Sequence, residues 1–336
     1  MPGLAEIAEA AGVSIPTVSR VLNRRAGVNA QTRARVLAVV ADRPYTRRGV
    51  RALQRTGVIG LLVPELSNPV FPAFAEALET RAAARGYSSV LCNTRSASLR
   101  EEEYVRVLLA RGVDGMVFVS PEAADTSAAH DHYQRLVDEG VRMMFVNGGA
   151  PTLDVPDVRV DEHAAGYLAT RHLLELGHTR IGLVAGPLRS VPTRAKTAGW
   201  QAALEEYGVT PDPGLLAHAE YGASGGADCA RRLLGAGRPT AVVCASDLMA
   251  LGAISEARRL ALDVPGDLSV VGFDDIPMAA YATPALTTLA QPIAEMAAVA
   301  VDCLVAELEG AAASSIPHSR VFRPRVVVRE STAAPA

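Results

Sequence analysis

Polar side chains stand directly after several apolar, strand-like runs of the sequence, where they could bind a small polar ligand. Carboxylates accept hydrogen bonds from neighbouring hydroxyl groups, and aromatic faces pack on C–H surfaces, which together are the chemistry of a sugar site. Each carboxylate alone could instead cap a helix. Their shared position favours a site, because ligands bind at the carboxyl ends of parallel strands. The candidates are Asn68, Phe71, Asn147, Asp161, Tyr221, Asp247, Asp274, Asp275 and Gln291.

Catalytic motifs are weak by comparison. Gly222–Gly226 reads G-A-S-G-G and matches the G-x-S-x-G nucleophile elbow of α/β-hydrolases, with Asp274 and His318 downstream in the corresponding order. The match is short, and it lacks an HGGG-type oxyanion motif. No G-x-G-x-x-G occurs, and Ala195 precedes the sole lysine, Lys196, which excludes a Walker loop. We therefore expect no enzymatic activity and no cofactor.

The cysteines and histidines do not form a metal-binding pattern. The four cysteines, Cys92, Cys229, Cys244 and Cys303, lie far apart without a C-x-x-C, so they are predicted to be reduced and buried, with no metal site. The segment H130-D-H132 lies in a polar stretch and is predicted to be a surface loop.

The body of the chain alternates apolar strand-like runs with helical stretches. This alternation predicts parallel sheets covered by helices on both faces. The similarity of I59-G-L-L-V to I181-G-L-V-A indicates two such units in tandem. The predicted strands are 58–63, 89–92, 115–120, 142–147, 180–186, 215–220, 240–246, 268–274 and 286–290, and the predicted helices are 71–85, 99–110, 162–176, 194–207, 225–235, 247–260 and 292–309.

The N-terminal segment has the pattern of a helix-turn-helix. Residues 4–11 form a short apolar-faced helix that Gly12 ends, and Ser14 is a natural N-cap for a second helix. A third helix is predicted from about Ala30 to Asp42, capped by Asn29, with Val36, Leu37 and Val40 facing inward.

This N-terminal segment is also strongly basic. Residues 1–56 hold ten arginines against Glu6, Glu9 and Asp42, a formal charge of +7, whereas the whole chain carries −3. The remaining residues are therefore acidic, and a basic head on an acidic body is the electrostatic footprint of a protein that binds a polyanion. The chain has 336 residues, enough for two or three domains, and no apolar run approaches the roughly 18 residues of a membrane span. We expect a cytoplasmic protein without a membrane partner.

The head resembles that of the LacI/GalR (lactose-repressor) family of bacterial transcription regulators. The resemblance rests on the run A8-E-A-A-G-V-S-I-P-T-V-S-R-V-L-N23, followed by V28-N-A-Q-T-R-A-R-V36. It implies phosphate contacts from Ser14, Thr17, Ser19 and Asn23, and base reading by Ile15, Pro16 and Arg20. Phosphate contacts position such a protein, and base contacts specify its site. Since Ile15 and Pro16 cannot hydrogen-bond a base edge, discrimination must depend on Arg20 and on apolar contacts with thymine methyls.

The resemblance also implies a hinge helix between head and body. The segment T46-R-R-G-V-R-A-L53 fits it, with Leu53 as the wedge that enters the minor groove and Val50 beside it. It departs from the family pattern because the usual Pro is absent, because Gly49 lowers helix propensity, and because the linker to Gly57 is about two or three residues shorter than is usual in the family.

In the body, Phe71, Asp161, Tyr221, Asp247, Asp274 and Gln291 fall at the family's effector positions. Lys196 stands where the family usually has an arginine, which replaces a guanidinium fork by a flexible point charge. The alternative for Lys196 is a solvated helix lysine. Trp200 is predicted to be a core residue.

The sequence therefore predicts an α/β protein: an all-α helix-turn-helix head (1–44), a hinge or linker (45–56), and a two-lobed, doubly wound parallel-sheet body of the periplasmic-binding-protein type (57–336). The first lobe is expected to comprise about 57–158 and 287–316, and the second about 159–286 and 317–336. The function implied is a ligand-responsive regulator, most often a repressor, that binds a palindromic double-stranded operator as a homodimer and a sugar or sugar derivative between its lobes. The alternatives are a solute-binding protein and a G-x-S-x-G hydrolase without DNA function.

Overall fold

The computed structural model of the chain describes residues 4–14, 17–18, 21, 28–42, 55–94, 100–120, 122–149, 152–236, 239–311 and 318–335. These residues divide into two units, a head made chiefly of residues up to Arg55 and a body that holds nearly all of the rest. The head and the body each have a hydrophobic core of their own.

The head contains helices α1 (Leu4–Ala11) and α3 (Ala30–Asp42). Gly12 ends α1 with a left-handed φ of +60°, and the amide of Val13 donates to the carbonyl of Ala8. Asn29 caps α3, because its Oδ1 accepts from the amide of Thr32 at 2.7 Å. Both helix boundaries agree with the predictions from sequence.

The core of the head is small and comes from three segments of the chain. One predicted core residue, Leu37, is instead 48% exposed. Successive residues of a helix are turned by about 100°, so Leu37 leaves the face that its buried neighbour Val36 presents to the core. The buried residues are Ala8, Ala11, Val18, Val21 and Val36.

The first lobe of the body is built on a six-stranded sheet in the order β11-β5-β4-β3-β1-β2, and every neighbouring pair is parallel. Helices cover both faces: Leu304 of α12 lies against Gly115, and Leu108 of α5 lies against Gly60, which pairs with Met116, the residue after Gly115. The elements are β1 (Val58–Val63), α4 (Val70–Ala84), β2 (Ser88–Asn93), α5 (Glu101–Ala110), β3 (Gly115–Val119), η1 (Glu122–Ala124), α6 (Asp131–Glu139), β4 (Met143–Val146), β5 (Asp157–Val160), α12 (Ile293–Leu308) and β11 (Ser319–Phe322).

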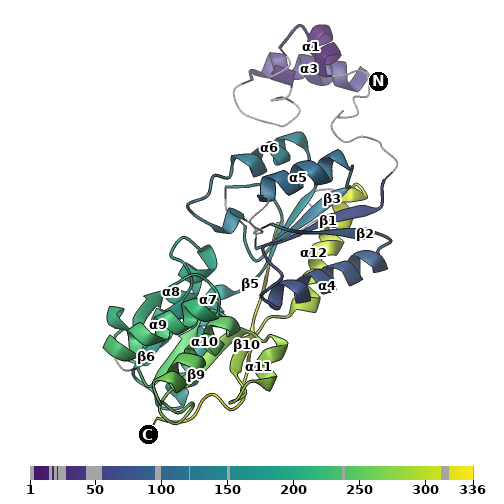
Figure 1. Ribbon diagram of the computed structural model, residues 1–336. Coiled ribbons are helices and arrows are strands. Elements are labelled where there is room, and N and C mark those ends of the chain that lie inside the picture. The colour runs from purple at the N-terminus through teal and green to yellow at the C-terminus, as the bar shows by residue number, and fades with distance from the viewer. Residues whose placement is uncertain are drawn as a thin grey trace. The chain divides into compact units, whose positions relative to one another are not determined.

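The second lobe repeats this architecture with the strand order β12-β10-β9-β8-β6-β7. Figure 1 shows the two lobes of the body. Its pairs are parallel except β10 with β12, which are antiparallel. The elements are α7 (Glu162–Glu175), β6 (Ile181–Ala185), α8 (Val191–Glu206), η2 (Pro213–Leu215), β7 (Leu216–His218), α9 (Ala223–Ala236), β8 (Ala241–Cys244), α10 (Asp247–Arg259), β9 (Ser269–Asp274), α11 (Pro277–Tyr281), β10 (Thr287–Ala290) and β12 (Arg325–Val327).

The chain passes between the lobes three times, after β5, after β10 and after β11. Each crossing lies a few residues later than the expected boundaries at 158, 286 and 316. The reason is strand pairing: β10 pairs with β9 in the second sheet, and β11 pairs with β5 in the first. Such partners cannot be identified from the short apolar runs themselves.

Most of the predicted elements of the body are present, including the short strands β4, β8 and β10. Trp200 is buried in the core, where its Nε1 donates to the carbonyl of Ile181. Helix α8 begins earlier than predicted, because Ser190 caps it and Pro192 fits its first turn. The sequence pattern had missed α6, α11, β5, β11 and β12.

Candidate ligand-binding cavity

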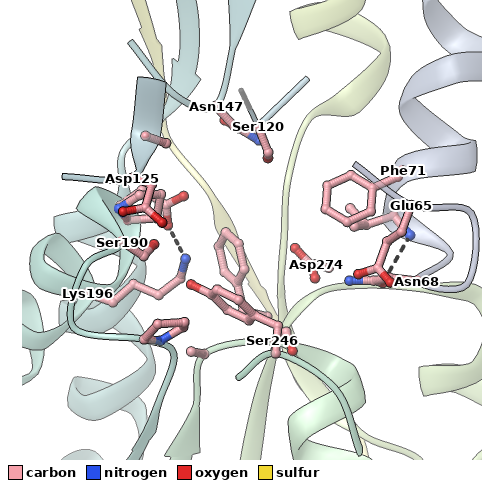
Figure 2. A pocket seen from close by; sticks show the side chains of 18 of the residues that line it. Glu65, Asn68, Phe71, Ser120, Asp125, Asn147, Ser190, Lys196, Ser246 and Asp274 are labelled. Atoms are coloured by element: carbon pink, nitrogen blue, oxygen red, sulfur yellow. Dashed lines mark hydrogen bonds and ion pairs between the residues drawn. The ribbon is translucent and has the colours of Figure 1, made fainter. Parts of the chain in front are cut away.

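A cavity of about 440 Å³ lies between the two lobes of the body, at the carboxyl ends of the strands of both sheets. Figure 2 shows Glu65, Asn68 and Phe71 on one side of it, Lys196 on the other, and Asp274 between them. The volume falls within the range of about 300–1,000 Å³ that is typical of small-molecule sites. The topology explains the position, since the strand ends of a doubly wound sheet leave a crevice.

Most of the ligand-site residues predicted from the sequence line this cavity. Their shared location follows from their common place after the strands, and several of the polar side chains are almost completely buried. The lining residues among the predicted set are Asn68, Phe71, Asn147, Lys196, Tyr221, Asp274 and Gln291.

Three predicted carboxylates do not line the cavity: Asp275, which is bonded to Arg329 at 2.6 Å, Asp161 and Asp247. Asp161 is the N-cap of α7, and its Oδ1 accepts from the amide of Ala164 at 2.8 Å. Asp247 is 0% exposed, and it accepts from the hydroxyl of Thr288 and from the amide of Ile276. Their partners give these side chains a role in holding the frame of the second lobe.

Burial of Asp247 should make the stability of the protein depend on pH. Loss of hydration raises the pKa of this carboxyl to about 6. The stability that its protonated form contributes is fully present below the unfolded-state pKa of about 3.9 and is lost as the pH rises through about 6. The shift corresponds to about 3 kcal/mol.

We expect Asp247→Asn to remove this pH dependence, because its amide can donate to Thr288 and its oxygen can accept from Ile276. Urea unfolding of both proteins at pH 4 and pH 7 checks it. The stability of the wild type relative to the variant should fall by about 2 kcal/mol between these pH values, because the unfolded-state carboxyl is already partly ionised at pH 4. A difference that stays constant with pH would show that Asp247 is ionised throughout.

The cavity is lined by residues in a strained backbone conformation. Ser120, Asn147 and Asp274 have φ values of 48°, 55° and 120°, in the left-handed region that favours glycine. Each comes at or just after the end of a strand, and each faces the cavity. Such strain costs about 1–3 kcal/mol per residue and is typical of functional sites.

A chain of hydrogen bonds, called the relay below, joins the two lobes through residues that line the cavity. In the first lobe, the amide of Val160 donates to Oδ1 of Asn147 at 2.9 Å. Asn147 Nδ2 donates to Oε1 of Gln291 at 2.8 Å, and Gln291 Nε2 donates to Oδ1 of Asp274 in the second lobe at 2.7 Å. Gln291 follows β10 at a crossing between the lobes, so its amide orients a carboxylate of one lobe and an amide of the other.

Lys196 is a buried charge and not a solvated helix lysine. It is 5% exposed, forms an ion pair with Glu162 of α7, and has its Nζ 3.9 Å from the centroid of the Phe273 ring. Burial opposes its charge, and the carboxylate of Glu162 more than offsets this, so the pKa of Lys196 is raised. The ammonium is therefore charged and already partnered.

A second set of contacts joins the lobes at the rim of the cavity. We call it the clasp: Asp125 and Thr126 of the first lobe with Arg189 and Ser190 of the second. Asp125 and Ser190 form an antiparallel bridge, and the amide of Thr126 donates to the carbonyl of Arg189 at 2.8 Å. The Arg189 side chain donates through Nε to Asp125 at 2.9 Å and through Nη2 to Glu220 at 2.8 Å.

The clasp and several acidic lining residues were not predicted from the sequence. Glu162 had a usable signal, because it follows Asp161 in the first turn of a predicted helix. No local sequence signal marks Asp125 or Arg189, since their pairing depends on how two loops of different lobes meet. The missed polar lining residues are Glu65, Ser120, Glu122, Asp125, Glu162, Arg189, Ser190, Glu220 and Ser246.

The hydrolase elbow is not assembled. Ser224 is exposed on α9, Asp274 accepts from Gln291, and His318 Nδ1 lies 3.7 Å from Asp154. Among the described residues, no group of His, Cys, Asp and Glu is arranged to hold a metal ion.

One predicted surface residue is buried. His132 is 8% exposed on α6, where its ring stacks against Tyr133. The prediction of a surface loop was wrong, because this segment forms the start of α6 and the side chain is buried against Tyr133 and Glu101. The four cysteines are free, as expected, but Cys303 is only partly buried.

The predicted DNA-binding residues are described only in part. Ser14 is exposed, and its hydroxyl lies 2.9 Å from that of Thr17, in the first turn after α1. The other predicted DNA-binding residues lie outside the described residues: Ile15, Pro16, Ser19, Arg20, Asn23, Val50 and Leu53.

No helix in the described part of the chain is long and apolar enough to cross a membrane.

Comparison with known proteins accounts for both units. Residues 3–47 match the family described as bacterial regulatory proteins, lacI family, and residues 170–332 match the periplasmic binding protein-like domain. Over its length the chain is 45% identical to the HTH-type transcriptional regulator MalR of Streptomyces coelicolor, covering 98% of this chain and 96% of that protein. The chain belongs to the LacI family. It is a LacI-family DNA-binding transcriptional regulator, as the resemblance of the head and body implied.

Solved structures of the LacI family share the whole fold. The transcriptional regulator CelR in complex with cellobiose superposes with a TM-score of 0.74 at 30% identity, covering 98% of this chain and all of CelR. The lac repressor dimer bound to operator and the anti-inducer ONPF has a TM-score of 0.72 at 30% identity, with 99% of each chain covered. The LacI-family architecture predicted from the sequence is therefore confirmed.

Proposed function

We propose that this LacI-family regulator binds a sugar or sugar derivative in the cavity, and that the bound sugar controls its affinity for a palindromic operator. The observation that carries the proposal is the donor and acceptor set of the cavity. Buried Asn68 and Asp274 supply hydrogen-bonding groups, and Phe71 and Tyr221 supply ring faces for C–H surfaces. The cellobiose bound by the related CelR supports a sugar in particular.

The contacts between the lobes can couple ligand binding to the arrangement of the lobes. The clasp and the Asn147–Gln291–Asp274 relay both join the lobes, and both include residues that line the cavity. A ligand that contacts these groups favours one arrangement of the lobes, and operator affinity changes by the ratio of its affinities for the two arrangements. Repression is the proposed outcome of operator binding.

Fluorescence anisotropy with fragments of the gene's own upstream region tests this function. The full chain should bind one palindromic fragment tightly, and one sugar of a panel of sugars and nucleosides should shift the binding curve. The same experiment separates the alternatives, because a solute-binding protein binds the sugar and no DNA. Absence of DNA binding at low salt would contradict the regulator.

We expect Arg20→Ala to weaken operator binding and to relax its sequence preference. An arginine that reads a guanine contributes about 1–3 kcal/mol of discrimination at each half-site. Competition between the palindrome and a scrambled fragment of equal length measures this change. Binding to the scrambled fragment should change much less, since phosphate contacts carry it. Equal losses on both fragments would assign Arg20 to the phosphates.

We propose that the regulator acts as a homodimer, since a palindrome presents two inverted half-sites and needs two heads. Light scattering should give about twice the chain mass of 35.2 kDa.

A further inference from the structure

The charged residues that line the cavity are predominantly acidic. Among the described lining residues, six are carboxylates and two are cations, Arg189 and Lys196. The carboxylates are Glu65, Glu122, Asp125, Glu162, Glu220 and Asp274. Carboxylates accept hydrogen bonds from the hydroxyl groups of a neutral sugar, but they repel a phosphate or a second carboxylate.

Both lining cations are already neutralised by these carboxylates. The buried ammonium of Lys196 is held by Glu162 and lies over the ring of Phe273. The guanidinium of Arg189 is shared between Asp125 at 2.9 Å and Glu220 at 2.7 Å. An anionic ligand would have to compete with these carboxylates for either cation.

Three helix N-termini at the cavity are also occupied, whereas that of α4, which begins at Val70, has no side-chain cap. Helix N-termini are the usual backbone sites for phosphate. Here Asp161 caps α7, Ser190 caps α8 and Ser246 caps α10 through their own side chains. The first turns of α7 and α10 further carry the acidic residues Glu162 and Asp247, which cancel the positive end of the helix dipole.

Asp274 places a buried carboxyl group beside the ligand space. It is 7% exposed, its Oδ1 is bonded by Gln291, and its Oδ2 accepts no hydrogen bond from the described residues. Burial raises the pKa of this carboxyl, and the charge of nearby Asp247 raises it further. A sugar hydroxyl donated to Oδ2 would stabilise the carboxylate, whereas a second anion would destabilise it.

From the carboxylates, the paired cations and the capped helices together, we infer that the cavity selects an uncharged, unphosphorylated sugar and rejects sugar phosphates and sugar acids. This inference rests on the proposed sugar-binding function and narrows its ligand class. Rejection is electrostatic, so it should weaken when salt screens the lining charges.

Calorimetry on the full chain with matched pairs of sugars tests the inference. The probes are maltose, cellobiose and trehalose, each beside its 6-phosphate, in low and high NaCl. A parent sugar should bind at least roughly tenfold more tightly than its phosphate at low salt, and the ratio should fall at high salt. Exclusion by size alone would leave the ratio unchanged.

A variant pair connects this selectivity to one lining carboxylate. Glu220→Gln releases part of the charge of Arg189, so the ratio of parent to phosphate affinity should fall several-fold. Its matched control is Glu205→Gln, which removes an exposed carboxylate from α8 outside the cavity and should leave the ratio as it is.

The outcomes separate the two proposals. The charge selectivity is overturned if a sugar phosphate binds as tightly as its parent sugar, or if the ratio of their affinities changes neither with salt nor in Glu220→Gln. Either result leaves the proposed sugar site intact. Binding of neither member of any pair overturns the sugar site and the selectivity with it.

Discussion

Gly166→Ala is expected to destabilise the body by at least about 2 kcal/mol, although alanine is the better helix former by about 1 kcal/mol. A Cβ at Gly166 on α7 would stand 2.1 Å from the carbonyl oxygen of Lys196 on α8. The contact is reciprocal, because a Cβ at Gly199 on α8 would stand 2.0 Å from the carbonyl oxygen of His163. Neither helix can relieve a clash with backbone except by moving away.

The separation of α7 from α8 should also change the geometry of the ligand site. Separation of α7 and α8 moves Lys196 away from Glu162, since these residues stand on the two helices that the glycines bring together. Sugar affinity of Gly166→Ala should therefore fall along with its thermal stability. Calorimetric unfolding and sugar titration of the same preparation measure both.

Gly235→Ala on α9 is the matched control for this substitution. A Cβ at Gly235 would meet nothing within 4 Å, so only the helix propensity changes. This variant should be more stable than the wild type by up to about 1 kcal/mol. Similar effects of the two substitutions, in either direction, would show that the close helix contact does not exist in solution.

Asp274→Gly is expected to change stability and ligand binding in opposite directions. Glycine adopts the φ of 120° found at this position without strain, and the substitution also removes a buried carboxylate. The free energy of unfolding should rise by about 1 kcal/mol or more. Sugar affinity should fall at least roughly tenfold, because a buried hydrogen-bonding group is lost from the cavity.

Unfolding and calorimetry, each with and without the sugar, separate these two effects. Asp212→Asn is the control, since Asp212 caps an exposed 3₁₀ turn through Oδ1 and asparagine can do the same. If the variant loses stability or keeps full sugar affinity, Asp274 has a structural role in the second lobe and does not serve as the sugar-binding group proposed here.

Much of the fold could be predicted because it depends on local patterns. The strand Val58–Val63 and the start of α7 at Glu162 were found within a residue, since a buried strand is continuously apolar and a capped helix begins at a recognisable residue. Polar residues after such strands can be placed at one sheet edge by topology alone. This topology argument predicts a shared site for Asn68, Asn147 and Asp274, and all three line the cavity.

The remainder depended on contacts between segments far apart in the chain. Whether a carboxylate at a strand end faces the ligand space or the frame is decided by its neighbours: Thr288 and Ile276 hold Asp247, whereas Asp274 faces the cavity. The pairing of β10 and β11 with opposite sheets likewise has no local signal.

The sequence by itself determined the family, the helix-turn-helix signature, the two tandem α/β units and most of the polar residues at the strand ends. Only the tertiary structure decided that Lys196 is paired with Glu162, that Arg189 joins the two lobes, and that the acidic side chains meet in one cavity. Periodicity and capping act over a few residues and can be read along the chain. Charge pairing across a cavity depends on distances that only packing sets.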